Sequence, residues 1–476
     1  MAEELHLTIL HTNDLHGRVH QLGRIATLVK RIRQEVKDAG GQCLYLDAGD
    51  SEDTTLIESA LTRGSSMNAL LKAAGCDQVA LGNAIPIRYG PQAVENLAKA
   101  YGKPLLCANV YTPQNTILPG TQAFQVLEID HHAIAVIGFT APMDVYANFF
   151  KYITQEPIAL LPGLIEQARA EGAKTIIALT HIASPNDVQL AEMVNGIDVI
   201  VGGHDHQRIN PPQMVNDTLI VQAGQYGEVL GRLDLIIDRT SGEVIKHTGT
   251  LLTVSEEIPE ELGVLKAMGN ETARVDTLLN KVIGESLVPL ETSEDVECSA
   301  GNLQADAMLA YVKNAQIALM INGHWVSGLE AGRITQKQLY TANRSAGNPA
   351  LVKLSGAQIR QWLNAALDPE NIARKIHPLR GKAVGMPGIA GLTVVANRSH
   401  LSEMQIFFGD DLLSDDQEYR VAVSDLEISS LLNYLVIPDD QAEYEVPTVL
   451  PEVIEAYIQS HSPIREIHMG RIKLLD

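Results

Sequence analysis

Short apolar segments that end in polar residues recur along the first half of the chain. The first of them, residues 7–17, reads LTILHTNDLHG, where an apolar run predicts a buried strand and the turn after it holds Asp14 and His16. Further segments of this kind read CLYLDAGD, QVALGN, TIIALTH and DVIVGGHDH. Each predicts a short strand whose carboxyl end carries a carboxylate, an amide or an imidazole.

Between these strands the apolar positions follow the period of an α-helix. Residues 22–37 show it most clearly, because an apolar stripe runs along one side of the helix and basic residues lie opposite. The sequence also predicts helices over residues 59–74, 91–100, 158–170 and 188–194. Strands that alternate with helices form parallel sheets covered by helices, so the first half of the chain predicts an α/β fold.

Other regions depart from this alternation. Residues 124–139 and 219–254 predict antiparallel strands, and residues 256–281 predict a charged helix. Segments such as AQIALMIN and YRVAVSD then supply a second set of core residues, and 476 residues suffice for two cores. We therefore expect one domain over residues 1–255, a helical linker over residues 256–282 and a second domain over residues 283–476.

The composition narrows the range of partners. The formal net charge is −22 and aromatic residues make up only 4% of the chain, so we expect no nucleic-acid polymer and no anionic membrane as a partner. No apolar run is long enough to span a bilayer. The expected partner is a small phosphorylated molecule drawn by local cations, and the expected state is a monomer or a dimer.

The amino terminus and the cysteines bear on the compartment. The first ten residues, MAEELHLTIL, contain no basic segment followed by an apolar one, which predicts a cytoplasmic protein without an export signal. A periplasmic or secreted protein that had been processed and given a new Met would look the same. The four cysteines form no C-x-x-C pair and predict buried thiols in a reducing compartment.

The polar residues at the strand ends predict a metal site. An isolated Asp-x-His more often caps a helix, but here residues of metal-binding type follow five strands, and strand ends meet in the crevice where open α/β sheets bind ligands. The seven candidate ligands are Asp14, His16, Asp50, Asn83, His181, His204 and His206. Two divalent ions about 3.5–4 Å apart need a bridging carboxylate, for which we expect Asp50. These ligands suit Mn²⁺, Zn²⁺ or Fe²⁺.

In this order and spacing, the motifs HTNDLHG, DAGD, LGN, LTH and GGHDH resemble those of the calcineurin-like metallophosphoesterases, in particular the bacterial 5′-nucleotidase and UDP-sugar hydrolase branch. The later segments GNLQADAML, GRITQKQLY and LVKLSGAQIRQWL resemble the carboxyl-terminal domain of that branch. The resemblance implies a four-layer α/β sandwich, an interdomain helix and an α+β substrate-recognition domain. It also implies that one ion is held by Asp14, His16, Asp50 and His206, and the other by Asp50, Asn83, His181 and His204.

The chain departs from the family where catalysis is assisted. The family motif G-N-H-E-F-D reads GNAIPI here, so that Ala84 and Ile87 stand in place of a His and an Asp. That pair stabilises charge on the phosphoryl group and assists the leaving oxygen, which is typically worth about 10²- to 10⁴-fold in rate. No catalytic residue is therefore retained at the family pair.

The second half departs as well. The family motif N-G-G-G-I-R reads NGHWVS, which loses an Arg, and P-F-G-N reads SAGN, where Ala346 replaces a base-stacking Phe. The candidates for substrate contact in these segments are Asn322, His324, Trp325, Arg344 and Asn348. Packing is the alternative role for Trp325, and a solvated loop is the alternative setting for Arg344.

Two hypotheses follow. The first is a two-metal hydrolase of phosphate esters that favours a diester or an anhydride with a good leaving group and acts poorly on 5′-nucleotides; the same scaffold could also hydrolyse a sulfur ester. The second is a catalytically degenerate family member that keeps the metals and binds a ligand or a partner. The intact ligand set favours the first hypothesis, and the combined loss of the His/Asp pair, the Arg and the Phe favours the second.

Overall fold

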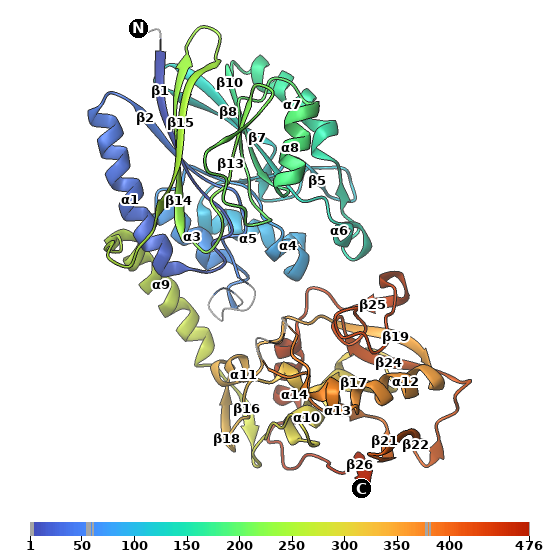
Figure 1. Cartoon of the computed structure of the whole chain (residues 1–476). Coiled ribbons are helices and arrows are strands. Elements are labelled where there is room, and N and C mark those ends of the chain that lie inside the picture. Colours follow the sequence, from blue (N-terminus) through green and yellow to red (C-terminus); the bar gives the residue numbers. More distant parts are fainter. Residues whose placement is uncertain (1–3, 54–58, 60, 377–378, 380–381, 476) are drawn as a thin grey trace. The chain divides into compact units, whose positions relative to one another are not determined.

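The computed structural model describes residues 4–53, 59, 61–376, 379 and 382–475. The chain divides into two compact units, Met1–Val275 and Asp276–Asp476, and the division falls within helix α9 (Leu262–Leu279) (Figure 1). This division does not test the expectation that residues 256–282 form a separate linker, which stays a prediction. The two units are described in turn.

The first unit contains two large sheets and two short strand pairs, β4 (Leu105–Leu106) with β6 (Thr121–Gln122) and β5 (Val110–Tyr111) with β9 (Ile153–Thr154). The five-stranded sheet has the order β15-β14-β1-β2-β3. Strands β1, β2 and β3 are parallel to one another, and β14 is antiparallel to both of its neighbours, β1 and β15. Its strands are β1 (Glu4–Thr12), β2 (Gln42–Asp47), β3 (Gln78–Val79), β14 (Val229–Asp238) and β15 (Val244–Thr253).

The second sheet of this unit has six strands in the order β12-β13-β11-β10-β8-β7. Its bounds are β7 (Phe124–Ile129), β8 (His132–Thr140), β10 (Thr175–His181), β11 (Val199–Val201), β12 (Gln213–Val215) and β13 (Thr218–Val221). Strands β8, β10, β11 and β13 are parallel, whereas the edge strands β7 and β12 are antiparallel to their neighbours. The antiparallel pair predicted over residues 124–139 is thus present as β7 and β8.

The two sheets pack face to face. Residues of β1 and β10 such as Leu7, Ile177 and Leu179 belong to the core between the sheets, whereas Ile176 and Ala178 face the opposite side and pack against helices α7 and α8. The longer helices of this unit include α1 (Val19–Asp38), α3 (Ser65–Ala73), α5 (Val94–Tyr101), α7 (Pro157–Ala170) and α8 (Ser184–Met193), and the shorter ones include α4 (Ala84–Tyr89) and α6 (Asp144–Asn148). Figure 1 shows α1, α3 and α5 beside the first sheet and α7 and α8 beside the second. The predicted four-layer α/β sandwich is confirmed.

The helix starts show which local signals the apolar pattern missed. Helix α1 begins at Val19, before the apolar stripe starts at Leu22. Helix α8 begins at Ser184, with Pro185 in its first turn, where a missing backbone N–H costs nothing. The sequence predicts one helix over residues 59–74, whereas α3 begins at Ser65, directly after Gly64. Residue 60 of that prediction lies outside the described residues.

The second unit is built on a mixed sheet of order β20-β17-β24-β19-β25. The bounds are β17 (Ile317–Ile321), β19 (Pro349–Ser355), β20 (Pro387–Ala390), β24 (Glu418–Ser424) and β25 (Ala442–Tyr444). One face packs on α12 through residues that include Ile317, Leu319 and Trp362, and the other packs on α10 and α14 through residues that include Ala318 and Met320. The helices are α10 (Ser299–Tyr311), α11 (Gln336–Ala342), α12 (Gly356–Ala366), α13 (Pro369–Ala373) and α14 (Leu450–His461).

A second, four-stranded sheet has the order β23-β22-β21-β26, and β16 pairs with β18. These strands are β16 (Val282–Ser286), β18 (Gly332–Thr335), β21 (Thr393–Asn397), β22 (His400–Phe408), β23 (Asp411–Leu412) and β26 (Ile472–Leu475). The unit thus combines antiparallel and parallel strands with helices, as the α+β prediction requires. Among the helices of the described residues, none has the length and apolar character needed to cross a membrane.

Candidate metal centre

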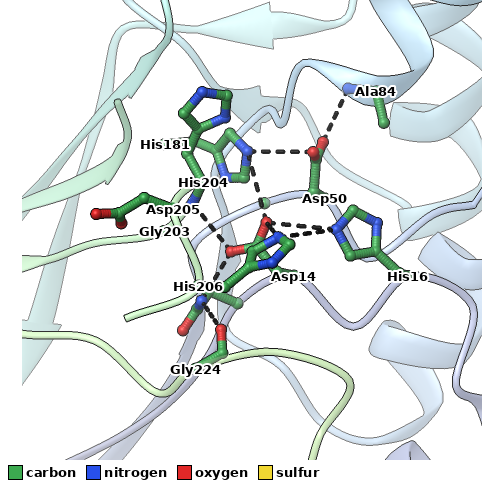
Figure 2. A network of polar contacts seen from close by, with 12 residues as sticks. Asp14, His16, Asp50, Ala84, His181, Gly203, His204, Asp205, His206 and Gly224 are labelled. Atoms are coloured by element: carbon green, nitrogen blue, oxygen red, sulfur yellow. Dashed lines mark hydrogen bonds and ion pairs between the residues drawn. The ribbon is translucent and has the colours of Figure 1, made fainter. Parts of the chain in front are cut away.

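The candidate ligands follow the carboxyl ends of strands from both sheets of the first unit (Figure 2). Asp14 and His16 follow β1, and Asp50 follows β2. His181 is the last residue of β10, and His204 and His206 follow β11. Because parallel strands of two packed sheets end at the same edge, residues almost two hundred positions apart come into contact there.

Two groups of potential ligand atoms lie at this edge. In the first, the Nε2 atoms of His16 and His206 lie 3.3 Å apart, and they lie 3.6 and 3.2 Å from Asp14 Oδ1. In the second, His181 Nε2 lies 3.2 Å from Asp50 Oδ2 and 3.9 Å from Asp14 Oδ1. Asp14 is therefore common to both groups, and the bridging role expected of Asp50 stays a prediction.

The remaining two candidates lie against the same groups. The ring of His204 packs edge-on against that of His181, with centroids 5.1 Å apart, and its backbone N donates to Asp14 Oδ2 at 2.9 Å. Asn83 lies between Gly82, which packs on Asp50, and Ala84, whose backbone N donates to Asp50 Oδ1 at 2.9 Å. All seven residues thus belong to one edge of the unit.

Three buried atoms at this edge lack a hydrogen-bond partner within the described part of the chain: Asp14 Oδ1, Asn83 Oδ1 and His181 Nε2. A buried polar atom without a partner costs about 1–3 kcal/mol. Carboxylate, amide and imidazole donors are ligands of Mn²⁺, Zn²⁺ and Fe²⁺, and a bound ion would satisfy such atoms. The residues present therefore fit a divalent metal ion.

Backbone carbonyls orient two of the imidazoles. Nδ1 of His181 lies 2.7 Å from the carbonyl oxygen of Ala48, and Nδ1 of His16 lies 3.2 Å from that of Glu52. Each Nδ1 can donate its hydrogen to the carbonyl, which leaves the lone pair of Nε2 facing the carboxylates. Metal-binding histidines are commonly held in this way.

The charges of the site oppose the effect of burial. Burial lowers the pKa of His181, but the negative charges of Asp50 and Asp14 outweigh it and raise that pKa to about 10. Burial would raise the pKa of Asp14, yet the charge of His181, the adjacent imidazoles of His16 and His206 and the hydrogen bond from Asn13 hold it well below its ordinary value. Without metal the site thus carries ionised carboxylates and a protonated imidazole, and a metal ion would have to displace that proton.

Most of the candidate ligands have a left-handed backbone. The φ angles are 51° at Asp14, 43° at His16, 50° at Asp50, 90° at His204 and 60° at His206. Residues other than glycine rarely adopt this region, which costs about 1–3 kcal/mol each and is found mainly where the surroundings enforce it at functional sites. No pattern of residue types indicated this strain.

Glycine is required where two ligand loops approach each other. A Cβ at Gly82 would lie 2.1 Å from Asp50 Oδ1 and 2.3 Å from the Asp50 backbone N, and one at Gly203 would lie 2.9 Å from His181 Nδ1. Any larger residue would displace a candidate ligand. The glycines of L-G-N and G-G-H-D-H thus serve the geometry of the site.

The positions of the missing His/Asp pair are occupied by side chains that cannot donate. Ala84 begins the short helix α4 (Ala84–Tyr89), and Ile87 lies one turn further along it. Figure 2 shows Ala84 next to Asp50, so the methyl group stands at the edge of the metal centre. At these two positions the contact with the metal centre is made by the backbone N of Ala84, which donates to Asp50 Oδ1.

Sequence reasoning missed Tyr226 and Arg18, which flank the first group. The backbone N of Tyr226 donates to the carbonyl oxygen of Asp14 at 2.8 Å, and its ring centroid lies 5.9 Å from that of His16. The guanidinium carbon of Arg18 lies 4.5 Å from the centroid of the Tyr226 ring. Arg18 follows the HTNDLHG motif directly, whereas nothing in the sequence near Tyr226 pointed to the site.

In the second unit, His324 and Trp325 are buried, with 3% and 2% of their surface exposed. His324 Nε2 lies 2.9 Å from Glu427 Oε1. Burial would raise the pKa of Glu427, but His324 and several hydrogen bonds lower it. Trp325 belongs to the core on the α10 and α14 face of the sheet, as its packing alternative expected.

The other three candidates of this unit make local contacts. Asn322 Nδ2 donates to the carbonyl oxygen of Ser293 at 3.2 Å, and Asn348 Nδ2 donates to that of Thr448 at 2.7 Å. Arg344 is exposed, and its Nε lies 3.4 Å from the carbonyl oxygen of Thr341. A role of these residues in substrate binding stays a prediction.

Fold and site together define a metallohydrolase, and comparison with known proteins gives the family. The model of the calcineurin-like phosphoesterases matches residues 7–208, and that of the 5′-nucleotidase C-terminal domain matches residues 280–431. The chain belongs to the calcineurin-like phosphoesterases and carries the C-terminal domain of the 5′-nucleotidases. Members of this family hydrolyse phosphate esters and use divalent metals, so the predicted family and enzyme class are confirmed.

Individual relatives are distant but cover nearly the whole chain. The uncharacterized metallophosphoesterase YunD of Bacillus subtilis is 23% identical over 462 residues, which cover 95% of this chain and 99% of that protein. A 5′-nucleotidase of Vibrio parahaemolyticus is 27% identical over 528 residues, covering 96% and 90%. The crystal structure of a 5′-nucleotidase precursor from Thermus thermophilus has a TM-score of 0.57 at 22% identity and covers 99% of this chain and all of that one. This last likeness is one of fold.

Proposed function

We propose that the chain hydrolyses a small phosphate diester or anhydride with a good leaving group at a centre of two divalent ions, Mn²⁺, Zn²⁺ or Fe²⁺. The seven candidate ligands would hold the ions, with Asp14 or Asp50 shared between them. When bound, such ions lower the pKa of water and neutralise charge on phosphoryl oxygens. The observation that carries the preference is the methyl group of Ala84 beside Asp50, where the family has a donor.

The side chains of the site divide the reaction into two halves. The attacking half depends on the carboxylates and imidazoles, and all of them are present. The leaving half depends on a proton donor near the departing oxygen, and neither Ala84 nor Ile87 can provide one. A substrate whose leaving group is stable as an anion needs that proton least.

The test compares p-nitrophenyl phosphate, bis(p-nitrophenyl) phosphate and an alkyl phosphate monoester with Mn²⁺ present. We expect turnover to fall as the pKa of the leaving group rises and the diester to be preferred to the alkyl monoester. A preference for the alkyl monoester would show that another residue acts as the acid.

The proposal extends to nucleotides. Ala346 stands where the family has the base-stacking Phe. His324 and Trp325, which lie in the segment that resembles the family motif N-G-G-G-I-R, are buried among side chains of their own unit. Base stacking is commonly worth about 1–3 kcal/mol, so 5′-nucleotides should be poor substrates. We expect kcat/KM for AMP below about 10⁴ M⁻¹s⁻¹, the low end for ordinary enzymes; a higher value would contradict this reading of the second unit.

The second candidate function is a metal-containing protein that binds a ligand without turning it over. The loss of donors at Ala84 and Ile87, together with the burial of His324 and Trp325, favours it. A preparation that binds Mn²⁺ but hydrolyses no member of a broad ester panel would support this candidate over the first.

A further inference from the structure

Asn13 is a buried amide at the end of β1, with 2% of its surface exposed. Both polar atoms of its side chain are used. Nδ2 donates to Asp14 Oδ2 at 2.7 Å and to the carbonyl oxygen of Gly224 at 2.5 Å, while Oδ1 accepts from the backbone N of Ala223 at 2.8 Å. One side chain thus joins a candidate ligand to a loop more than two hundred residues away in the sequence.

These bonds distinguish the two oxygens of Asp14. Oδ2 accepts from Asn13 Nδ2 and, at 2.9 Å, from the backbone N of His204, so its donors come from the protein. Oδ1 has no hydrogen-bond partner among the described residues and faces the Nε2 atoms of the imidazoles at 3.2–3.9 Å. The terminal torsion of an aspartate is broad and roughly two-fold, so the carboxylate would otherwise turn easily.

We propose that Asn13 is a positioning residue for metal binding: it holds the Asp14 carboxylate so that Oδ2 faces the protein and Oδ1 faces the ions. The inference rests on the proposed metal centre and not on the proposed substrate. An oriented carboxylate loses less freedom when an ion binds, and such supporting contacts are typically worth about 10- to 100-fold in metal affinity.

The loop that Asn13 contacts also helps to hold the backbone of Asp14. The backbone N of Tyr226, in the same loop as Ala223 and Gly224, donates to the carbonyl oxygen of Asp14 at 2.8 Å. Asp14 and Tyr226 both have left-handed backbones, with φ angles of 51° and 59°. Asn13 therefore joins the strained backbone of Asp14 to the loop that holds Tyr226.

The test is the Mn²⁺ dissociation constant of the full chain, measured by isothermal titration calorimetry for the wild type and for Asn13→Ala. We expect about 10- to 100-fold weaker binding in the variant. If Asn13→Ala does not fold, Asn13→Ser, which keeps a small polar side chain, takes its place with the same direction of effect.

The matched control is Asn109→Ala. Asn109 is also buried in the first unit, and its side-chain amide also bonds to the backbone. Nδ2 donates to the carbonyl oxygens of Thr140 and Gln155 at 2.8 and 3.3 Å, and Oδ1 accepts from the backbone N of Thr140 at 3.0 Å. It contacts no candidate ligand, so the control should lose thermal stability and keep the wild-type Mn²⁺ affinity.

Unchanged affinity in Asn13→Ala, or an equal loss in Asn109→Ala, would overturn the inference and leave Asn13 a role in folding alone. Calorimetry reports metal binding directly, so weaker binding in Asn13→Ala alone supports the inference even if no ester in the panel is hydrolysed.

Discussion

Two buried carboxylates, one in each unit, show the difference between a site and a structural support. In the second unit, Glu427 Oε1 accepts from His324 Nε2 and from the backbone N of Ile321, and Oε2 accepts from the backbone N and the hydroxyl of Ser424. In the first unit, Asp14 has donors on Oδ2 only, while Oδ1 faces imidazoles without a hydrogen bond from the described residues. Both carboxylates are fully buried, and only that of Asp14 has an oxygen free for a ligand.

The comparison teaches that burial of a charge does not identify a binding site. Glu427 is saturated by the protein, so the contact with His324 fixes the segment that holds His324 and Trp325. Asp14 is held on one side and open on the other, in a backbone that is strained at most of the candidate ligands. An unsatisfied atom within an otherwise rigid network is the feature that indicates a ligand.

The largest expected effect tests which carboxylate the two ions share. Asp14→Ala should abolish binding of both ions, because Asp14 Oδ1 belongs to both groups of ligand atoms. Hydrolysis should then fall by at least about 10²-fold, as expected when metal-derived stabilisation is lost. Elemental analysis after reconstitution with Mn²⁺ measures the metal content.

Two further variants complete this test. Glu427→Gln should keep the full metal content, because Glu427 belongs to the second unit and contacts no candidate ligand. If Asp14→Ala retains one ion while Asp50→Ala loses both, then Asp50 is the bridge, as the sequence led us to expect.

The second effect concerns the support in the other unit. His324→Ala should lower the free energy of unfolding by about 3–5 kcal/mol, because removing one partner leaves a buried charge uncompensated. Chemical denaturation followed by circular dichroism measures this, and Mn²⁺ affinity should not change. A stability loss within experimental error would show that the pair with Glu427 contributes little.

The pH dependence of the same variant has a definite sign. In the wild type, His324 and the hydrogen bonds lower the pKa of Glu427, so this group contributes stability that is present above its ordinary pKa and is lost as the pH falls through the lowered value. Without His324 the largest effect that opposes burial is lost, so we expect the pKa of Glu427 to rise and the folded variant to bind a proton more readily than the unfolded chain. The stability deficit of His324→Ala should therefore shrink as the pH falls from about 8 towards 5.

The third effect would restore the leaving half of the reaction. Ala84→His combined with Ile87→Asp should raise alkyl monoester turnover by about 10²-fold, and by more than the product of the single changes, because the two residues act as a unit. A double-mutant cycle with the alkyl monoester and bis(p-nitrophenyl) phosphate measures the coupling. Equal gains on both substrates would mean that the pair does more than assist the leaving group.

The metal edge could be predicted from sequence because every candidate ligand lies at the carboxyl end of a strand or shortly after it. The pattern of apolar runs ending in Asp14, Asp50 and His181 is local, and the meeting of strand ends is a general property of such sheets. The orientation of Asp14 could not be predicted, since it depends on Asn13 and on a loop near Gly224. That contact spans 211 positions of sequence.

The second unit was harder to predict for the same physical reason. His324 and Trp325 occupy positions where the related motif has glycines, and this placed them near a ligand. The partner that buries His324 is Glu427, 103 residues away, in a segment with no recognisable motif. The residue type of His324 indicated contact with a ligand, whereas its ion pair with the distant Glu427 places it in the protein interior.

The smallest effect is a proton count, which separates the two kinds of ligand within the metal edge. The carboxylate of Asp14 is already ionised without metal, because its pKa lies well below the ordinary value, so it releases no proton when an ion binds. His181 has a pKa raised to about 10 and is protonated near neutral pH. An ion that binds at Nε2 must displace this proton, so Mn²⁺ binding at about pH 8 should release at least one proton, and the apparent affinity should rise by about tenfold per pH unit up to the pKa of His181.

Calorimetry in Tris and in HEPES, which differ in ionisation enthalpy, gives the number of protons. A binding enthalpy that does not depend on the buffer would mean that His181 is neutral before the metal arrives, and that the two carboxylates do not together hold its proton.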